Sequence, residues 1–98
     1  MKTFKYNDTE VSLKRNSYRN NGSLAVEMIT VPDEEPFAMI TVNLGCPLQS
    51  DRIAFVDENN IPGIDAWLRK NGIAKPLGYK QRSGFCTYEL YSFNPAAL

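Results

Sequence analysis

The sequence contains no histidine among its 98 residues. Histidine is the commonest general base of enzymes and a frequent zinc ligand, so neither use of an imidazole is open to this chain. Two cysteines, Cys46 and Cys86, cannot supply the four ligands of a structural zinc site. We therefore expect a protein that is not an enzyme and that holds no metal or cofactor, although Asp, Glu, Tyr and Lys could still act as acids or bases.

Long apolar runs are also missing. The first residues lack the apolar stretch of a signal peptide, and nothing approaches the roughly 18 apolar residues of a membrane span. Two cysteines forty residues apart do not make a disulfide framework. We expect a cytoplasmic protein, away from membranes, with both thiols reduced. Cys86 falls on an expected strand, so we interpret it as a packed core thiol and not as a nucleophile.

The chain has no net charge, because eleven Lys and Arg balance eleven Asp and Glu. No overall field therefore attracts nucleic acid or an acidic membrane. The charges are unevenly spread, however. Residues 1–22 carry five basic and two acidic side chains, residues 23–65 carry one basic and eight acidic, and residues 66–98 carry five basic and one acidic. If the two ends meet in space, one basic and one acidic surface result.

What is present is a composition of 43% hydrophobic and 22% charged residues, in a length typical of one domain, residues 1–98. Strand patterns cover residues 3–6, 11–18, 23–31, 37–44, 53–56 and 85–93. The Asn20-Asn21-Gly22 sequence is a strong hairpin signal. Residues 37–44 are apolar on both faces, which predicts a central strand covered on both sides.

One helix is predicted over residues 61–71. Asn60 is placed to cap it, Pro62 falls in its first turn, and Gly72 provides a left-handed stop. Its apolar residues share one face, with Trp67 as the expected anchor, largely buried between helix and sheet. We predict an α+β fold, a mainly antiparallel sheet of about five or six strands with this one short helix packed on one face.

Two segments carry candidate binding groups. Residues 57–60 cluster side-chain oxygens suited to calcium or magnesium, but the spacing is not that of an EF-hand, and a capped strand-to-helix turn is the alternative. Residues 78–84, expected to be an exposed loop, hold two glycines, two cations and a hydroxyl that could cradle a phosphate, without the Walker spacing. We predict a contact patch of Tyr79, Lys80 and Arg82, with Asp57 and Asn59 nearby if both loops lie at one end of the sheet.

Aromatic residues interleave with cations over residues 75–93, a pattern that weakly suggests stacking on single-stranded nucleic acid. Aromatic side chains on strands also form cross-strand pairs, which is the alternative interpretation.

The motifs FVDENN-x-P, NGIAKPLG and SGFCTYELYSFN resemble a family of small proteins from gut anaerobic bacteria, often carried on conjugative elements or prophages. It is a domain-of-unknown-function family. The resemblance covers about residues 23–94 and is most specific over residues 55–60 and 83–94. It implies a bacterial cytoplasmic protein linked to mobile DNA, and it carries over no catalytic residues.

These observations favour a non-enzymatic binding or accessory module of a mobile element that contacts a protein partner. The alternative is a nucleic-acid-binding module that uses the basic N- and C-terminal segments. An enzyme is the third class considered.

Overall fold

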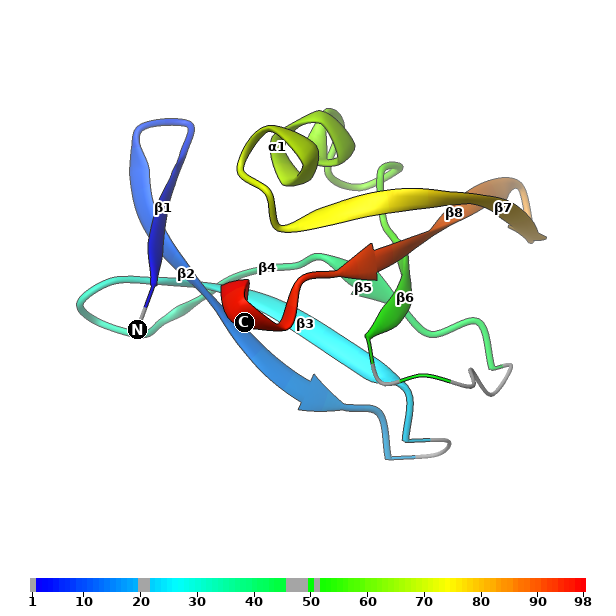
Figure 1. Cartoon of the computed structure of the whole chain (residues 1–98), viewed down its shortest axis with the longest axis horizontal. Coiled ribbons are helices and arrows are strands. Elements are labelled where there is room, and N and C mark those ends of the chain that lie inside the picture. The colour runs from blue at the N-terminus through cyan, green and yellow to red at the C-terminus, as the bar shows by residue number, and fades with distance from the viewer. Residues whose placement is uncertain (1, 20–21, 46–49, 51) are drawn as a thin grey trace.

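The structure, a computed structural model, describes residues 2–19, 22–45, 50 and 52–98. These residues form eight strands, one α-helix and a final 3₁₀ turn, which are β1 (Thr3–Tyr6), β2 (Thr9–Ser17), β3 (Leu24–Thr30), β4 (Pro36–Met39), β5 (Thr41–Val42), β6 (Ile53–Val56), α1 (Ile64–Lys70), β7 (Ala74–Ser83), β8 (Cys86–Phe93) and η1 (Pro95–Ala97). The strands pair into two antiparallel sheets, ordered β1-β2-β3-β4 and β5-β6-β8-β7 (Figure 1). A mainly antiparallel fold with one short helix is confirmed, but the described strands number eight in two sheets and not five or six in one.

The first sheet is built from consecutive hairpins. Strands β1 and β2 meet at a two-residue turn, where Asn7 and Asp8 have φ angles of 47° and 68°. Two positive φ angles define the turn whose twist matches that of paired strands, and Asn and Asp tolerate it well. The hairpin predicted between β2 and β3 is confirmed by their antiparallel pairing. Asn20 and Asn21 of its turn lie outside the described residues.

The chain passes from the first sheet to the second at Ile40. Its N–H donates to the Val26 carbonyl of β3 at 3.0 Å, and its own carbonyl accepts the N–H of Asp57, just after β6, at 2.9 Å. The next residue, Thr41, accepts at its hydroxyl from the Val26 N–H at 3.1 Å. Ile40 is completely buried, so the crossing point is also part of the core.

The central strand predicted over residues 37–44 is therefore wrong. This segment divides at Ile40 into β4, at the edge of one sheet, and β5, at the edge of the other. Within β4, Ala38 packs against the core, so Phe37 and Met39 point to the opposite face and are 45% and 44% exposed. The segment is apolar on both faces because its first half belongs to one sheet and its second half to the other.

The hydrophobic core lies between the two sheets and the helix. The sheets meet face to face, as alternate side chains of each point inward. The first sheet contributes Phe4, Val11, Leu13, Leu24, Val26 and Met28, the second contributes Ala54, Val56, Tyr91 and Phe93, and the helix contributes Ile64 and Leu68. We call the core-facing side of the second sheet its inner face, and the opposite side its outer face.

The helix is shorter than predicted and begins later, at Ile64. Its N-cap is Gly63, with a φ of 84° and no side-chain cap. Asn60, the predicted cap, instead directs its side-chain amide to Asp57 Oδ2 at 2.8 Å. The chain makes an additional turn, with the Ile61 N–H bonded to the Asp57 carbonyl, and this turn delays the start of the helix.

The predicted stop at Gly72 is confirmed. Gly72 has a φ of 67°, its N–H bonds to the Arg69 carbonyl, and the Ile73 N–H bonds to the Leu68 carbonyl at 2.9 Å. These two bonds are the Schellman pattern that satisfies the last carbonyls of a helix.

Trp67 is not the buried anchor that the sequence predicts. The helix lies between the β1–β2 hairpin and β7 (Figure 1), and Trp67 is only half-buried against β1. Its indole Nε1 donates to the Lys5 carbonyl at 2.7 Å, and its ring lies 5.3 Å from that of Tyr6. The fully buried helix residues are Ile64 and Leu68, one turn apart. Because the helix lies at an edge of the two-sheet sandwich, the Trp67 side chain lies at the rim of the core and not inside it.

Candidate functional site

The distal half of the β7–β8 hairpin extends beyond the rest of its sheet. Strand β6 pairs with β8 only from Ser92 to Glu89, whereas β7 continues to pair with β8 out to Ser83 and Cys86. Among the described strands, residues 80–88 thus have ladder partners only within the β7–β8 hairpin. We call residues 80–88 the arm, and Figure 1 shows it at the far right, where β7 and β8 meet.

The exposed loop predicted over residues 78–84 is wrong, because most of this segment is strand β7. The reversal occurs at Gly84 and Phe85, between the paired residues Ser83 and Cys86. Gly84 has a φ of 63°, which suits the first position of a two-residue hairpin turn. Gly78, with a φ of 82°, lies where the β7–β8 register shifts. The glycines therefore mark an irregularity and a turn within one hairpin.

Phe85 is the most exposed large apolar side chain of the described residues. It lies at the tip of the arm and is 101% exposed, although the sequence pattern predicts that a strand begins at this residue. The Arg82 Nε donates to the Gly84 carbonyl at 3.2 Å, which holds that guanidinium close to the tip. An aromatic ring beside an arginine is a common composition of protein interfaces.

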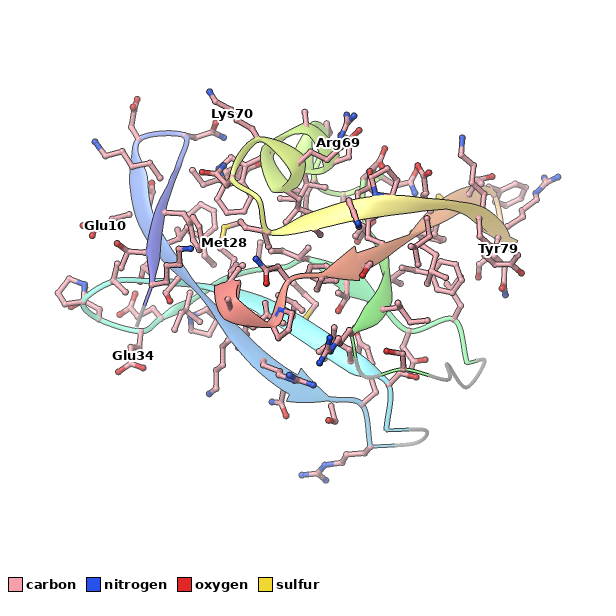
Figure 2. All side chains as sticks on the ribbon, in the orientation of Figure 1. Glu10, Met28, Glu34, Arg69, Lys70 and Tyr79 are labelled. Carbon is pink, nitrogen blue, oxygen red and sulfur yellow. The ribbon has the colours of Figure 1, made fainter. Side chains whose placement is uncertain are left out.

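The structure separates the predicted contact residues onto two faces. Tyr79 lies on the outer face, 53% exposed, with its ring 6.2 Å from that of Phe55. Lys80 and Arg82 alternate with it along β7 and stand on the inner-face side, where Lys80 is opposite Glu89. Figure 2 shows Tyr79 near the far end of β7. Lys80 and Arg82 can act together, whereas Tyr79 contacts a different surface.

Asp57 and Asn59 lie in the turn between β6 and α1. Asp57 accepts the Asn60 N–H at 3.2 Å as well as its side-chain amide, so residues 57–60 form a hydrogen-bonded turn. Desolvation and then the neighbouring Cys86 raise the pKa of Tyr88, and the Asp57 carboxylate adds to the effect. Asp57 is thereby near the outer-face side chains of the arm, while Asn59 is exposed.

Cys86 is at the base of the tip and not in the core. It is half-buried and has a free thiol, on the same side of β8 as Tyr88 and opposite to Tyr91. The expectation of a core-facing thiol is therefore wrong. Cys46 lies outside the described residues.

The most perturbed carboxyl group is that of Glu58, near the inner-face side of the arm. Desolvation raises its pKa, the Asp65 and Glu89 carboxylates raise it further, and Lys80 lowers it. The pKa of the nearby Tyr91 hydroxyl is raised to about 12, by burial first and by the Glu58 carboxylate second. The described residues contain no group of three or more metal-ligating side chains close enough to hold an ion. In the same part of the chain, no helix is long and apolar enough to cross a membrane.

These features define a small domain of two antiparallel sheets and one short helix, with a projecting hairpin arm. A family model described as Domain of unknown function (DUF4313) matches residues 12–98, and the chain belongs to this family. The resemblance to a domain-of-unknown-function family is thus confirmed. No curated protein and no solved structure matches the chain significantly.

Proposed function

We propose that this protein is a non-enzymatic binding module that contacts a protein partner through the arm. The proposal rests on one observation, the fully exposed ring of Phe85 at the tip of a two-stranded projection. Exposing such a ring to water is unfavourable, by about 1.5–3 kcal/mol relative to its burial. An apolar recess on a partner would recover this free energy, and such recesses commonly receive aromatic anchors.

The charges of the arm indicate which partner surface would fit. Lys80 and Arg82 lie on one side of β7, and Arg82 is held beside the tip. Acidic groups around an apolar recess would complement them and would increase the association rate more than the affinity. Tyr79, Asp57 and Asn59 remain outlying contacts in this proposal, on the opposite side of the arm or at its base.

Non-enzymatic action fits the placement of Glu58, whose carboxyl group has a clearly raised pKa. Glu58 does not line the cavity at the other end of the β7–β8 hairpin, which lies between the end of α1, the start of β7 and the end of β8. A binding role in the cytoplasm, accessory to a mobile genetic element, is what the family resemblance implies, and we include it in the proposal.

The experiment is affinity capture from a bacterial host lysate, followed by calorimetry with the purified protein that is captured. Phe85→Ala should weaken that complex by about tenfold or more, as expected of an interface hot spot. Phe37→Ala is the matched control, because Phe37 is also exposed but lies at the edge of the other sheet. A complex that weakens with Phe37→Ala and not with Phe85→Ala contradicts the proposal.

The alternative function is nucleic-acid binding, and the shape of the arm favours it specifically. A two-stranded ribbon fits the major groove of DNA, and an apolar side chain at its tip can wedge between base steps. In that case a gel shift with duplex DNA should lose affinity steeply between low and moderate salt, and Lys80→Ala with Arg82→Ala should reduce the slope of that dependence. Binding that is insensitive to salt excludes this alternative.

A further inference from the structure

A second site lies at the opposite end of the β7–β8 hairpin from the arm. A cavity of about 380 Å³ opens between the end of α1, the first residues of β7 and the last of β8. The polar and charged residues that line it are Arg52, Arg69, Lys75, Ser92 and Asn94. Three cations, contributed by separate elements, therefore border one small space.

The strand pairing fixes two of these groups side by side. Lys75 of β7 and Ser92 of β8 are direct cross-strand partners, so their Cβ atoms lie about 4.5–5.5 Å apart. Arg52 is positioned by its backbone, because its carbonyl accepts the Phe93 N–H at 2.7 Å. Lys75, Ser92 and Arg52 thus line the cavity from backbone positions that the sheet fixes.

Two of the three cations have no ion-pair partner in the part of the chain that is described. Within it, neither Arg52 nor Lys75 has a carboxylate oxygen within 4 Å. Arg69 contacts Asp65, but at 3.5 Å and with a half-exposed side chain, so the pair is weak and easily rearranged. The cavity consequently carries a positive potential.

Backbone acceptors around the cavity are already engaged. The carbonyls of Gly72 and Ile73 accept from the side chain and the N–H of Asn94, at 3.4 and 2.7 Å. The Schellman bonds described above occupy those of Leu68 and Arg69. What the lining still offers a ligand is mainly side-chain donors, which suits an anion and not a cation.

We propose that this cavity binds the dianionic phosphoryl group of a small phosphorylated molecule. Three cations and a hydroxyl match the charge of about −1.5 to −2 and the three oxygens of a phosphate monoester better than they match a monoanionic carboxylate. The cavity volume lies near the lower end of the range for small-molecule sites, which leaves room for a short group attached to the phosphate. This site is independent of the arm and of the proposed partner binding.

The test is an NMR titration of the whole chain at constant ionic strength with three probes, inorganic phosphate, glycerol 3-phosphate and acetate. Amide signals of residues 72–75 and 92–94 should move with both phosphates. Acetate should bind at least about tenfold more weakly, because it carries one charge fewer. A tighter fit for glycerol 3-phosphate identifies a phosphorylated small molecule as the ligand, and equal affinity identifies free phosphate.

Substitutions complete the test. Arg52→Gln with Lys75→Gln removes two charges that have no described ion-pair partner, so the fold should persist and phosphate affinity should fall about tenfold or more. Lys14→Gln, an exposed cation on β2 of the other sheet, is the matched control and should leave the affinity unchanged. Equal effects of the two variants, or acetate binding as tightly as phosphate, would overturn the proposal.

Discussion

At the scale of single residues, the helix shows that size alone does not determine which side chain anchors an element. Trp67 is the largest residue of α1, yet Ile64 and Leu68 are fully buried and Trp67 is not. Trp67 packs its ring on β1 and satisfies its indole N–H with the Lys5 carbonyl. Such an amphipathic ring is well suited to the rim of a core, where one end is apolar and the other is wet.

The two positions should therefore respond differently to truncation. We expect Leu68→Ala to lower the free energy of unfolding by about 2–5 kcal/mol, because it opens a cavity in a closed core. Trp67→Ala should cost less than Leu68→Ala, since solvent already reaches part of the ring. Urea denaturation of both variants, with the exposed Lys70→Ala as control, measures this order. A larger loss for Trp67→Ala would show that the rim position carries the docking of the helix.

Glu58 gives the protein a predictable dependence on pH. Its pKa is raised in the folded state, chiefly by desolvation, so folding favours the protonated carboxyl. The stability from this preference is fully present below the unfolded pKa, near 4.5, and is lost as the pH rises through the higher folded pKa. At neutral pH, the ionised Glu58 therefore opposes folding.

Glu58→Gln removes that charge and keeps the size of the side chain. We expect its melting temperature to exceed that of the wild type at pH 7 and the difference to vanish towards pH 3. Thermal denaturation of the variant and the wild type from pH 3 to pH 7 measures this difference in melting temperature. The control is Asp33→Asn, which removes an exposed carboxylate in the β3–β4 turn. A constant difference at all pH values would mean that packing, and not ionisation, is responsible.

At the scale of elements, local sequence patterns predicted which segments form strands. They predicted less well which strands pair with each other in a sheet. The strands near residues 3–6, 11–18, 23–31 and 53–56 are present, because alternation and turn residues are local signals. Whether a strand lies at an edge or in the centre depends on pairing with distant segments, and for β4 and β5 the prediction was wrong. The same limit applies to β7, whose glycines and charges resemble those of a loop but whose backbone pairs with β8.

The residues of the candidate sites show even more clearly that local patterns do not predict which distant segments come together. Residues 78–84 were identified as a binding segment from their composition, and the structure places Lys80 and Arg82 on the arm but turns Tyr79 to the other face. The cavity at the opposite end of the β7–β8 hairpin from the arm was not predicted at all. Its cations come from positions 52, 69 and 75, with no shared spacing, and only the fold brings them together.

At the scale of the whole molecule, two sheets replace the single sheet that was expected. A single sheet of five or six strands with one short helix would leave much of its apolar surface in water. Folding the second sheet over the first covers the inner faces of both, and leaves the helix to close one side. The basic and acidic segments are thereby interleaved, because each sheet contains strands from more than one of them.

The double hydrogen bonding of Ile40 has a consequence for how the molecule opens. One residue donates to the first sheet and accepts from the second, so neither sheet can separate from it without breaking a buried bond. Local and global openings should then be distinguishable by native-state amide exchange. We expect the amides of Ile40 and Asp57 to exchange only when the entire domain unfolds, with one shared free energy. Amides of the arm should exchange through smaller fluctuations, because the arm can fray while both sheets persist.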